Sequence, residues 1–420
     1  MSQDLFHIPL ALVNREQIHS LLTRRLVETR HMEYKRDIPM TRDEARAVKD
    51  NKEKKKDPFF EFACDVSAFA NTDGGDILFG IGPDEHKRPI FVGVPEETLD
   101  HAKSHITNLV YDNIEPQIQA VNFQTVPYED GKAVLIMRIP KSIYGPHQVS
   151  IGRSKFWTRT AAGKISMDYQ ALHTAFTANV EIIERARDWR AKRLERIYAD
   201  LPFGISRRPL QILHLIPLSF KNAQGAIRLA TIAAMSGILR PASKYSITND
   251  RFTADGYASI LERDENNLVP GYTQVYRNGQ TESVTVVETG LFREYFSIYS
   301  LSLEREFVNA LERYLCALRL SGVNPPILIS LAYQNMAGLR MIHNSLINMI
   351  SQEITTSDAI FPDIVITGWP DKSEILEIAK SLLDCLWQAA GVEKSLNYPW
   401  TDLEEQDLEE YSRKALDSLI

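Results

Sequence analysis

The feature that most constrains this chain is an apolar stretch that ends in a polar turn and continues into a second apolar run. Residues 67–76 read Ser-Ala-Phe-Ala-Asn-Thr-Asp-Gly-Gly-Asp, and Ile-Leu-Phe-Gly-Ile-Gly follows at 77–82. The residues of 59–71 are apolar and helical in pattern, and glycine can adopt the positive φ that ends a helix. The sequence therefore predicts a buried helix, a tight turn and a strand.

Two interpretations of this turn are open. Gly74 and Gly75 can expose backbone N–H groups, as phosphate-binding loops do. They can also serve a turn that needs positive φ, and we favour this second interpretation. Asp73 and Asp76 are expected to be structural, the first in the turn and the second at the start of the strand.

A second short motif precedes this segment. Residues 28–35 read Glu-Thr-Arg-His-Met-Glu-Tyr-Lys, which places two carboxylates five residues apart and then a lysine. In a strand over 32–36, Glu33 and Lys35 lie on one face. Taken alone, such a pair is most simply an exposed ion pair. His31, between the two glutamates, and His147 are more simply interpreted as ordinary histidines than as parts of a site.

Together these motifs resemble the Schlafen AlbA-like (AlbA_2) domain. The resemblance covers roughly residues 12–178, because residues 155–159 also match a strand that ends in arginine and leads to a final helix near Asp168. It implies a mixed sheet with helices. In the Schlafen branch, acidic residues at matching positions cut RNA with a metal ion, and Glu28 and Glu33 match those residues in type and spacing.

The resemblance also implies the remaining parts of a metal centre. Its third carboxylate falls at Pro83, one residue before Asp84, so Asp84 is the expected third ligand, with Glu85 as its substitute. Glu28, Glu33 and Asp84 would hold Mg²⁺ or Mn²⁺, which prefer oxygen ligands. Lys35 would orient water or neutralise charge on the phosphate.

Phosphate contacts are expected from a basic segment with one aromatic residue. Basic side chains at alternate strand positions share a face, and an aromatic neighbour can stack on a base. The alternative is a solvated strand edge. The expected set is Arg153, Lys155, Trp157, Arg159 and Lys164. The run Lys52–Lys56 is more simply a solubilising loop, although such a loop could also clamp RNA.

Length and charge predict how these functions are divided. A chain of 420 residues is too long for one core, so we expect a domain over 1–178, a charged connector over 179–205 and a second domain over 206–420. Residues 1–200 hold 29 basic and 29 acidic residues, so the remainder carries the whole net charge of −7. A polyanion site therefore belongs to the first half.

The rest of the chain reads as mixed α/β, which makes the fold class α+β. The charged helix over 178–200 is either a solvated connector or a basic rail beside the cleft. Asn278-Gly279 lies between two β-rich runs and predicts a hairpin with a type I′ turn. Residues 302–320 have the spacing of an amphipathic helix.

Several function classes are excluded. No stretch approaches the ~18 apolar residues of a membrane span, and the start lacks the pattern of a signal peptide. The three cysteines lie far apart, which fits a reducing cytoplasm and gives no zinc spacing. Ala162-Gly163-Lys164-Ile165 lacks the upstream glycine and the hydroxyl of a Walker motif. No nucleophile elbow supports acyl transfer.

The sequence thus predicts a cytoplasmic, metal-dependent endoribonuclease of Schlafen-like type. Its substrate would be a structured, tRNA-like RNA, in a stress response or in antiviral (phage) defence. The second domain would sense, regulate or form a homodimer. The alternatives are a non-catalytic DNA- or RNA-binding regulator with the same fold, and a pure interaction module. The nuclease alone requires Glu28, Glu33 and Asp84 to converge within the reach of one metal ion.

Overall fold

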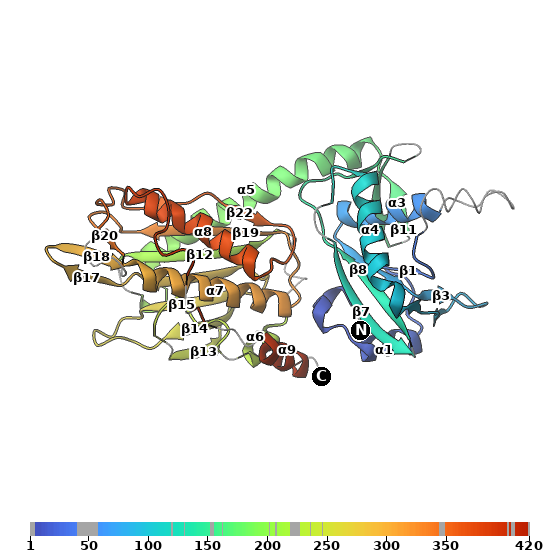
Figure 1. Cartoon of the computed structure of the whole chain (residues 1–420), viewed down its shortest axis with the longest axis horizontal. Helices are drawn as coiled ribbons and strands as arrows, with labels where there is room; N and C mark the ends of the chain where they lie inside the picture. The colour runs from blue at the N-terminus through green and yellow to red at the C-terminus, as the bar shows by residue number, and fades with distance from the viewer. Residues whose placement is uncertain are drawn as a thin grey trace. The chain divides into compact units, whose positions relative to one another are not determined.

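The computed structural model divides the chain into two compact units, Met1–Ile183 and Glu184–Ile420 (Figure 1). The described residues are 5–39, 58–118, 121–129, 131–151, 155–161, 163–200, 202–205, 208–218, 227–235, 237–245, 247–343, 349–400, 403–404 and 408–418. The basic run Lys52–Lys56 lies outside them.

The first unit combines short helices with two sheets and a small hairpin. Its helices are η1 (Leu5–His7), η2 (Leu10–Leu12), α1 (Arg15–Thr23), α3 (Pro58–Asn71), η3 (Glu96–Thr98), α4 (Leu99–Asn113) and the first part of α5 (Tyr169–Asp200). Its strands are β1 (Met32–Lys35), β2 (Gly75–Phe79), β3 (Ile81–Pro83), β4 (Pro89–Phe91), β5 (Val94–Pro95), β6 (Ile114–Glu115), β7 (Asn122–Glu129), β8 (Lys132–Ile139), β9 (Gln148–Val149), β10 (Lys155–Thr160) and β11 (Gly163–Ser166).

The main sheet of this unit is mixed, as expected. Its order is β1-β2-β8-β5, with β7 also paired to β8. Strand β1 runs parallel to β2, and the other pairs are antiparallel. The second sheet has the order β11-β10-β9-β6, and β3 pairs with β4 as a separate hairpin.

The core of the first unit lies between the main sheet and the helices α3 and α4. Apolar side chains of α3, α4, β2 and β8 form one buried cluster. On the main sheet, Asp76 pairs with Arg138 at 2.8 Å, and Arg138 also donates to the carbonyls of Leu5 and Ile8. Asp76 therefore has the structural role expected for it, because its ion pair fixes the N-terminal segment to the sheet.

The second unit is built around one large sheet. Its helices are the rest of α5, then η4 (Pro202–Gly204), α6 (Leu229–Ala234), α7 (Ser300–Leu320), α8 (Lys372–Ala389) and α9 (Leu408–Asp417). Its strands are β12 (Leu210–Pro217), β13 (Thr248–Phe252), β14 (Gly256–Leu261), β15 (Gly271–Tyr276), β16 (Thr281–Val286), β17 (Thr289–Phe292), β18 (Tyr295–Tyr299), β19 (Ile327–Gln334), β20 (Arg340–Ile342), β21 (Ala359–Ile360) and β22 (Ile364–Ile366).

The large sheet has the order β13-β14-β15-β16-β12-β19-β21, with β22 also paired to β19. Alternate residues of its strands face two different helices. Leu194 and Ile197 of α5 pack in one apolar cluster with Tyr272 and Val284. On the opposite face, the Tyr314 hydroxyl of α7 bonds to Thr273 and Ser283, and Thr273 pairs with Ser283 across β15 and β16. The sheet is therefore covered by α5 on one face and α7 on the other.

The basic residues of α5 have partners in the second unit. Arg193 donates two hydrogen bonds to the buried Glu282, each at 2.8 Å. Arg190 and Arg187 both bind Asp363. These three arginines recur every three residues and so lie on one face of the helix. Neither a solvated connector nor a free basic rail describes this face, because the three guanidinium groups attach α5 to the large sheet.

The fold class and the hairpin around Gly279 agree with the sequence predictions, but the type of the hairpin turn does not. The α+β class is confirmed by both units. The hairpin around Gly279 is confirmed too, with β15 paired to β16. The expected type I′ turn is wrong, because such a turn needs a positive φ at both Asn278 and Gly279. Gly279 has a φ of +83°, but the φ of Asn278 is not positive. The turn is type I with a glycine bulge.

No helix within the described residues is both long and apolar enough to cross a membrane.

Candidate charged site of the N-terminal unit

Strand β1 brings Glu33 and Lys35 to one side of the main sheet. Successive strand side chains alternate between faces, so these two residues point the same way. Lys35 Nζ lies 3.1 Å from Glu33 Oε1, as a simple ion pair would predict. The same ammonium group lies 2.7 Å from Asp65 Oδ2 on helix α3. The lysine is therefore shared by two carboxylates rather than paired on an open strand.

Asp65 is a central residue of the site that the sequence reasoning missed. Its side chain is 1% exposed, and it receives Lys164 Nζ at 2.8 Å in addition to Lys35. Glu61 and Asp65 are the two charged residues of α3 and are four positions apart, which places them on one helix face. That spacing was the available signal, because a buried acid on an apolar helix needs a cationic partner.

Arg159 and Lys164 close the group from strands β10 and β11. Arg159 Nη2 donates to Glu33 Oε2 at 2.5 Å, and its Nη1 lies 3.7 Å from Asp65. Its guanidinium also lies over the Phe69 ring, 4.3 Å from the centroid. Lys164 Nζ lies 2.8 Å from a Glu61 carboxylate oxygen. We call Glu33, Lys35, Glu61, Asp65, Arg159 and Lys164 the ionic cluster.

The ionic cluster is self-compensating. Three carboxylates face three cations, so the group has no net charge when all are ionised. Asp65 and Glu33 hold the pKa of Lys35 above its ordinary value, although burial acts in the opposite direction. Each carboxylate of the cluster lies beside at least one cation, so opposite charges face one another throughout the group. Its arrangement fixes β1, α3, β10 and β11 to one another.

Glu28 lies beside the cluster but outside its ion pairs. Its Oε1 accepts a hydrogen bond from the Tyr34 backbone N–H at 3.2 Å. The pKa of Glu28 is raised, mainly by partial burial of its carboxyl and to a smaller extent by repulsion from Glu33. The residue as a whole is exposed. Lys35 and Arg159 act on this pKa in the opposite direction. Glu28 and Glu33 are thus close enough to interact, as their spacing predicted.

The expected third metal ligand does not join this group. Asp84 lies in the turn between β3 and β4, where its Oδ1 accepts from the backbone N–H groups of His86 and Arg88 at 2.8 and 2.7 Å. The hydrogen bond from the Arg88 backbone N–H is the largest of the interactions that lower the pKa of Asp84. The carboxylate therefore shapes its own hairpin. Glu85, the expected substitute, is an exposed residue of the same turn.

The arrangement does not fit a metal ion. Among the described residues, no group of three or more His, Cys, Asp or Glu side chains could hold one. Both Glu33 carboxylate oxygens already bind cations, Lys35 and Arg159. The structure therefore does not bring Glu28, Glu33 and Asp84 together as one ligand set among the described residues, and a role for Mg²⁺ or Mn²⁺ stays a prediction. The position expected for the third ligand is occupied by Pro83, and the next residue, Asp84, lies in a turn. Its carboxylate accepts the backbone hydrogen bonds of that turn.

The expected phosphate-binding face is corrected as well. Arg159 is 4% exposed, and both it and Lys164 are bound within the ionic cluster. Trp157 is half-buried and packs edge-on against Phe60 of α3, with the two ring centroids 6.2 Å apart. Lys155 is exposed. Arg153 lies outside the described residues. One face of β10 is covered by α3, which explains why Arg159 turns inward although Lys155 of the same strand is exposed.

Exposed cations occur instead around the β3–β4 hairpin. Arg36 follows β1 directly, and its side chain lies over Gly82, where an added Cβ would come within 3.2 Å of it. Lys87 and Arg88 are exposed in the hairpin turn. We call Arg36, Lys87 and Arg88 the hairpin cations. The backbone N–H of Gly80 bonds to the Lys35 carbonyl, so the hairpin begins beside the end of β1 and hence beside the ionic cluster.

The signature motif at 67–76 has a structural role. Asn71 Nδ2 donates to the carbonyls of His147 and Trp157, both at 2.9 Å, and its Oδ1 accepts from the His147 N–H at 2.6 Å. Thr72 Oγ1 accepts from the Arg159 N–H at 2.9 Å. The helix end therefore holds β9 and β10 in place, including the strand that delivers Arg159.

The two glycines serve the turn. Gly74 has a φ of +81°, and an added Cβ at Gly75 would come within 2.1 Å of the Phe69 ring. These contacts support the tight-turn interpretation over a phosphate-binding loop. Asp73 pairs with Arg30 at 2.6 Å, and His31 Nδ1 bonds to the Gly74 carbonyl at 3.1 Å. Burial lowers the pKa of His147, whose Nδ1 bonds to Pro116. Neither histidine joins the cluster.

One comparison, with the profiles of known protein families, agrees with the N-terminal assignment. The sequence profile of the family described as "Schlafen, AlbA_2" matches residues 28–168. No curated protein matches the chain. Among solved structures, the chain is similar to the DIP2311 protein from Corynebacterium diphtheriae at 12% identity and a TM-score of 0.24, over 74% of this chain and 78% of that one.

Proposed function

Because residues 28–168 form a Schlafen AlbA_2 domain, we propose that this chain is a nucleic-acid-binding protein that contacts RNA through its N-terminal unit. The observation that carries the proposal is the set of exposed hairpin cations, which lie directly after β1 and in the turn of the hairpin that begins beside the end of β1. The family relates the domain to nucleic acid, and phosphate contacts supply most of the affinity of such proteins. RNA is the partner that the Schlafen resemblance favours, and DNA is the competing one.

The charge distribution supports this placement. The unit Met1–Ile183 holds 23 basic and 25 acidic residues, a net charge of −2, whereas Glu184–Ile420 holds 25 basic and 30 acidic residues, a net charge of −5. A polyanion is repelled by the second region unless basic groups are concentrated there. The ionic cluster has no net charge and would act as a rigid support for the hairpin cations. In this proposal the charged residues that hold the fold and those that meet phosphate are different residues.

RNA cleavage is the second candidate function, and one observation favours it. Partial burial and repulsion from Glu33 raise the pKa of Glu28, and a carboxyl with a raised pKa can take or give a proton closer to neutral pH. Glu28 would accept the proton of a ribose 2′-hydroxyl as that oxygen bonds to the adjacent phosphorus. The bond from phosphorus to the 5′-oxygen would break, and the departing 5′-oxygen would take a proton from water, which leaves a 2′,3′-cyclic phosphate and a free 5′-hydroxyl end. Lys35 would stabilise the negative charge that develops on the phosphate oxygens. No step is assigned to a metal ion, because the carboxylates do not fit one.

One experiment decides between these functions. A labelled transfer RNA and a DNA duplex of similar length are titrated with the whole chain, and binding is followed by fluorescence anisotropy. The same mixtures are then examined for cleavage in Mg²⁺, in Mn²⁺ and in EDTA. We expect RNA to bind without being cut. Absence of RNA binding at low salt would overturn the proposal, and tighter binding to DNA would change the partner.

The cleavage outcomes are also informative. Cutting that survives EDTA and is lost in Glu28→Gln supports the second candidate. Cutting that requires Mg²⁺ or Mn²⁺ restores the metal-dependent endoribonuclease and contradicts the geometry described above. The matched control is Glu97→Gln, which removes an exposed carboxylate from η3 of the same unit.

A further inference from the structure

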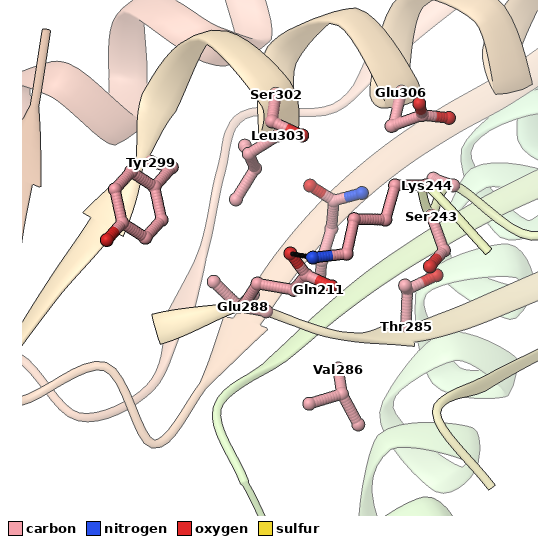
Figure 2. Close-up of a pocket in the computed structure, with 12 residues that line it drawn as sticks. Gln211, Ser243, Lys244, Thr285, Val286, Glu288, Tyr299, Ser302, Leu303 and Glu306 are labelled. Carbon is pink, nitrogen blue, oxygen red and sulfur yellow. Dashed lines mark ion pairs between the residues drawn. The ribbon is translucent and has the colours of Figure 1, made fainter. Parts of the chain in front are cut away.

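The exposed side of helix α1 carries basic residues that the functions above do not use. Residues three to four positions apart lie on one side of a helix, and six residues of α1 and its C-terminal end follow this spacing. We call them the α1 stripe: Arg15, Glu16, His19, Ser20, Thr23 and Arg24. The α1 stripe lines an open hollow of about 360 Å³. By comparison, the pocket beside the end of β16 and the start of α7 (Figure 2) has room of about 40 Å³, enough for only a few water molecules.

The two arginines of the α1 stripe have charge available for a ligand. Both are exposed, and neither forms an ion pair with any residue in the described part of the chain. The stripe contains one carboxylate, Glu16, against the two guanidinium groups, so its local charge is positive. This charge lies in a unit whose net charge is −2, where an anion can be attracted only by a local concentration of cations.

An aromatic side chain of β7 holds the start of the stripe in place. Arg15 Cζ lies 5.3 Å from the centroid of the Tyr128 ring, and His19 Nδ1 lies 3.0 Å from the Tyr128 hydroxyl oxygen. The Tyr128 ring packs in turn against Phe91 of β4, with the centroids 4.6 Å apart. A guanidinium that already rests on an aromatic ring loses less conformational freedom when it meets a phosphate.

Phe91 connects the α1 stripe to the β3–β4 hairpin, which projects from the first unit (Figure 1). Strand side chains alternate, so Phe91 lies on one face of the hairpin and Ile90 on the other. Ile90 pairs with Gly82, and the side chain of Arg36 lies over Gly82 on that second face. The other two hairpin cations lie in the turn between the strands. Cations therefore occur on both faces of the hairpin and at its tip.

Given the RNA-binding function proposed above, on which this inference rests, we propose that the α1 stripe is a second phosphate-contacting surface for the RNA. Arg15 and Arg24 are separated by about 13 Å along the helix axis, a distance that several nucleotide steps of a strand span. Two guanidinium groups at this separation suit a chain of phosphates better than a single small anion. The RNA would hold the hairpin between two segments of its backbone, one at Arg36 and the other at the α1 stripe.

The test is the salt dependence of the affinity of the whole chain for a stem-loop RNA, followed by fluorescence anisotropy. The α1 variant carries Arg15→Gln and Arg24→Gln, which remove two charges and keep polar side chains. We expect the slope of log affinity against log salt to fall by roughly two, because two phosphate contacts are lost. The control variant, Lys372→Gln with Lys394→Gln, removes two exposed charges from the second unit and should keep the slope.

Arginine modification of the unaltered chain gives a second readout that does not depend on any variant. Phenylglyoxal reacts with accessible guanidinium groups, and mass spectrometry reports the label at each position. We expect bound RNA to protect Arg15 and Arg24 together with Arg88 of the hairpin. The exposed Arg251 of the second unit should be labelled equally with and without RNA.

The outcomes separate this inference from the function on which it rests. An unchanged slope in the α1 variant would overturn the inference alone, provided that alanine at Arg36, Lys87 and Arg88 lowers the slope. Full labelling of Arg15 and Arg24 in the RNA complex would overturn it too. Absence of RNA binding by the whole chain would overturn the proposed function itself.

Discussion

At the scale of single residues, the charged side chains of the N-terminal unit divide into buried and exposed sets. Sequence alternation was sufficient to place Glu33 and Lys35 on one face, and their ion pair follows from it. It could not show that Arg159 lies inside the domain, because strand alternation does not say which face a helix covers. Asp65 was missed for the same reason: its partners come from strands distant in sequence.

The residue-scale prediction compares two basic positions of β10. Arg159→Met leaves Glu33 and Asp65 without the guanidinium that contacts both, and breaking a buried ion pair costs about 3–5 kcal/mol. Lys155→Met, at the exposed start of the same strand, should cost less than about 0.5 kcal/mol. The measurement is urea unfolding with hydrogen exchange of β1 and α3. Equal, small losses in both variants would contradict a buried role for Arg159.

At the scale of elements, local patterns predicted the individual helices well. The capping box at Asn14 and Gln17 is present at the start of α1, and α3 ends at Asn71, where the sequence placed its end. Contacts between elements were harder to foresee. Nothing in the local pattern around Asn71 indicates that its amide holds β9 and β10, because those strands form far along the chain. The Asn-Gly hairpin formed, but its turn is of another type than the expected one.

The element-scale prediction concerns this helix end. Asn71→Ala removes bonds to the His147 N–H and to the His147 and Trp157 carbonyls, and should cost about 2–4 kcal/mol because backbone groups lose their partners. The control, Asn113→Ala, removes a bond within helix α4 alone and should cost at most about 1 kcal/mol. Hydrogen exchange of β9 and β10 provides the measurement. Protection that is retained in Asn71→Ala would show that the strands do not depend on this residue.

At the scale of the whole molecule, the chain combines two units of different charge. The sequence predicted the α+β class and the mixed sheet of the AlbA_2 domain, and it assigned polyanion binding to the first half. It could not connect the α1 stripe with the β3–β4 hairpin, since Arg15, Phe91 and Tyr128 are scattered over α1, β4 and β7. Such a surface exists only after the helix and the strands have packed together.

The most direct test of the central claim is the salt dependence of RNA binding by the whole chain. Each phosphate contact adds roughly one to the slope of log affinity against log salt, because a bound cation releases counterions. The hairpin variant replaces Arg36, Lys87 and Arg88 with alanine. The control variant replaces three exposed cations of the second unit, Arg251, Lys372 and Lys394, and so removes the same charge.

We predict that the hairpin variant binds RNA more weakly, with a slope reduced by roughly two to three, and that the control variant keeps the slope of the unaltered chain. An unchanged slope in the hairpin variant, or a comparable loss in the control variant, would contradict the assignment of RNA binding to the N-terminal unit.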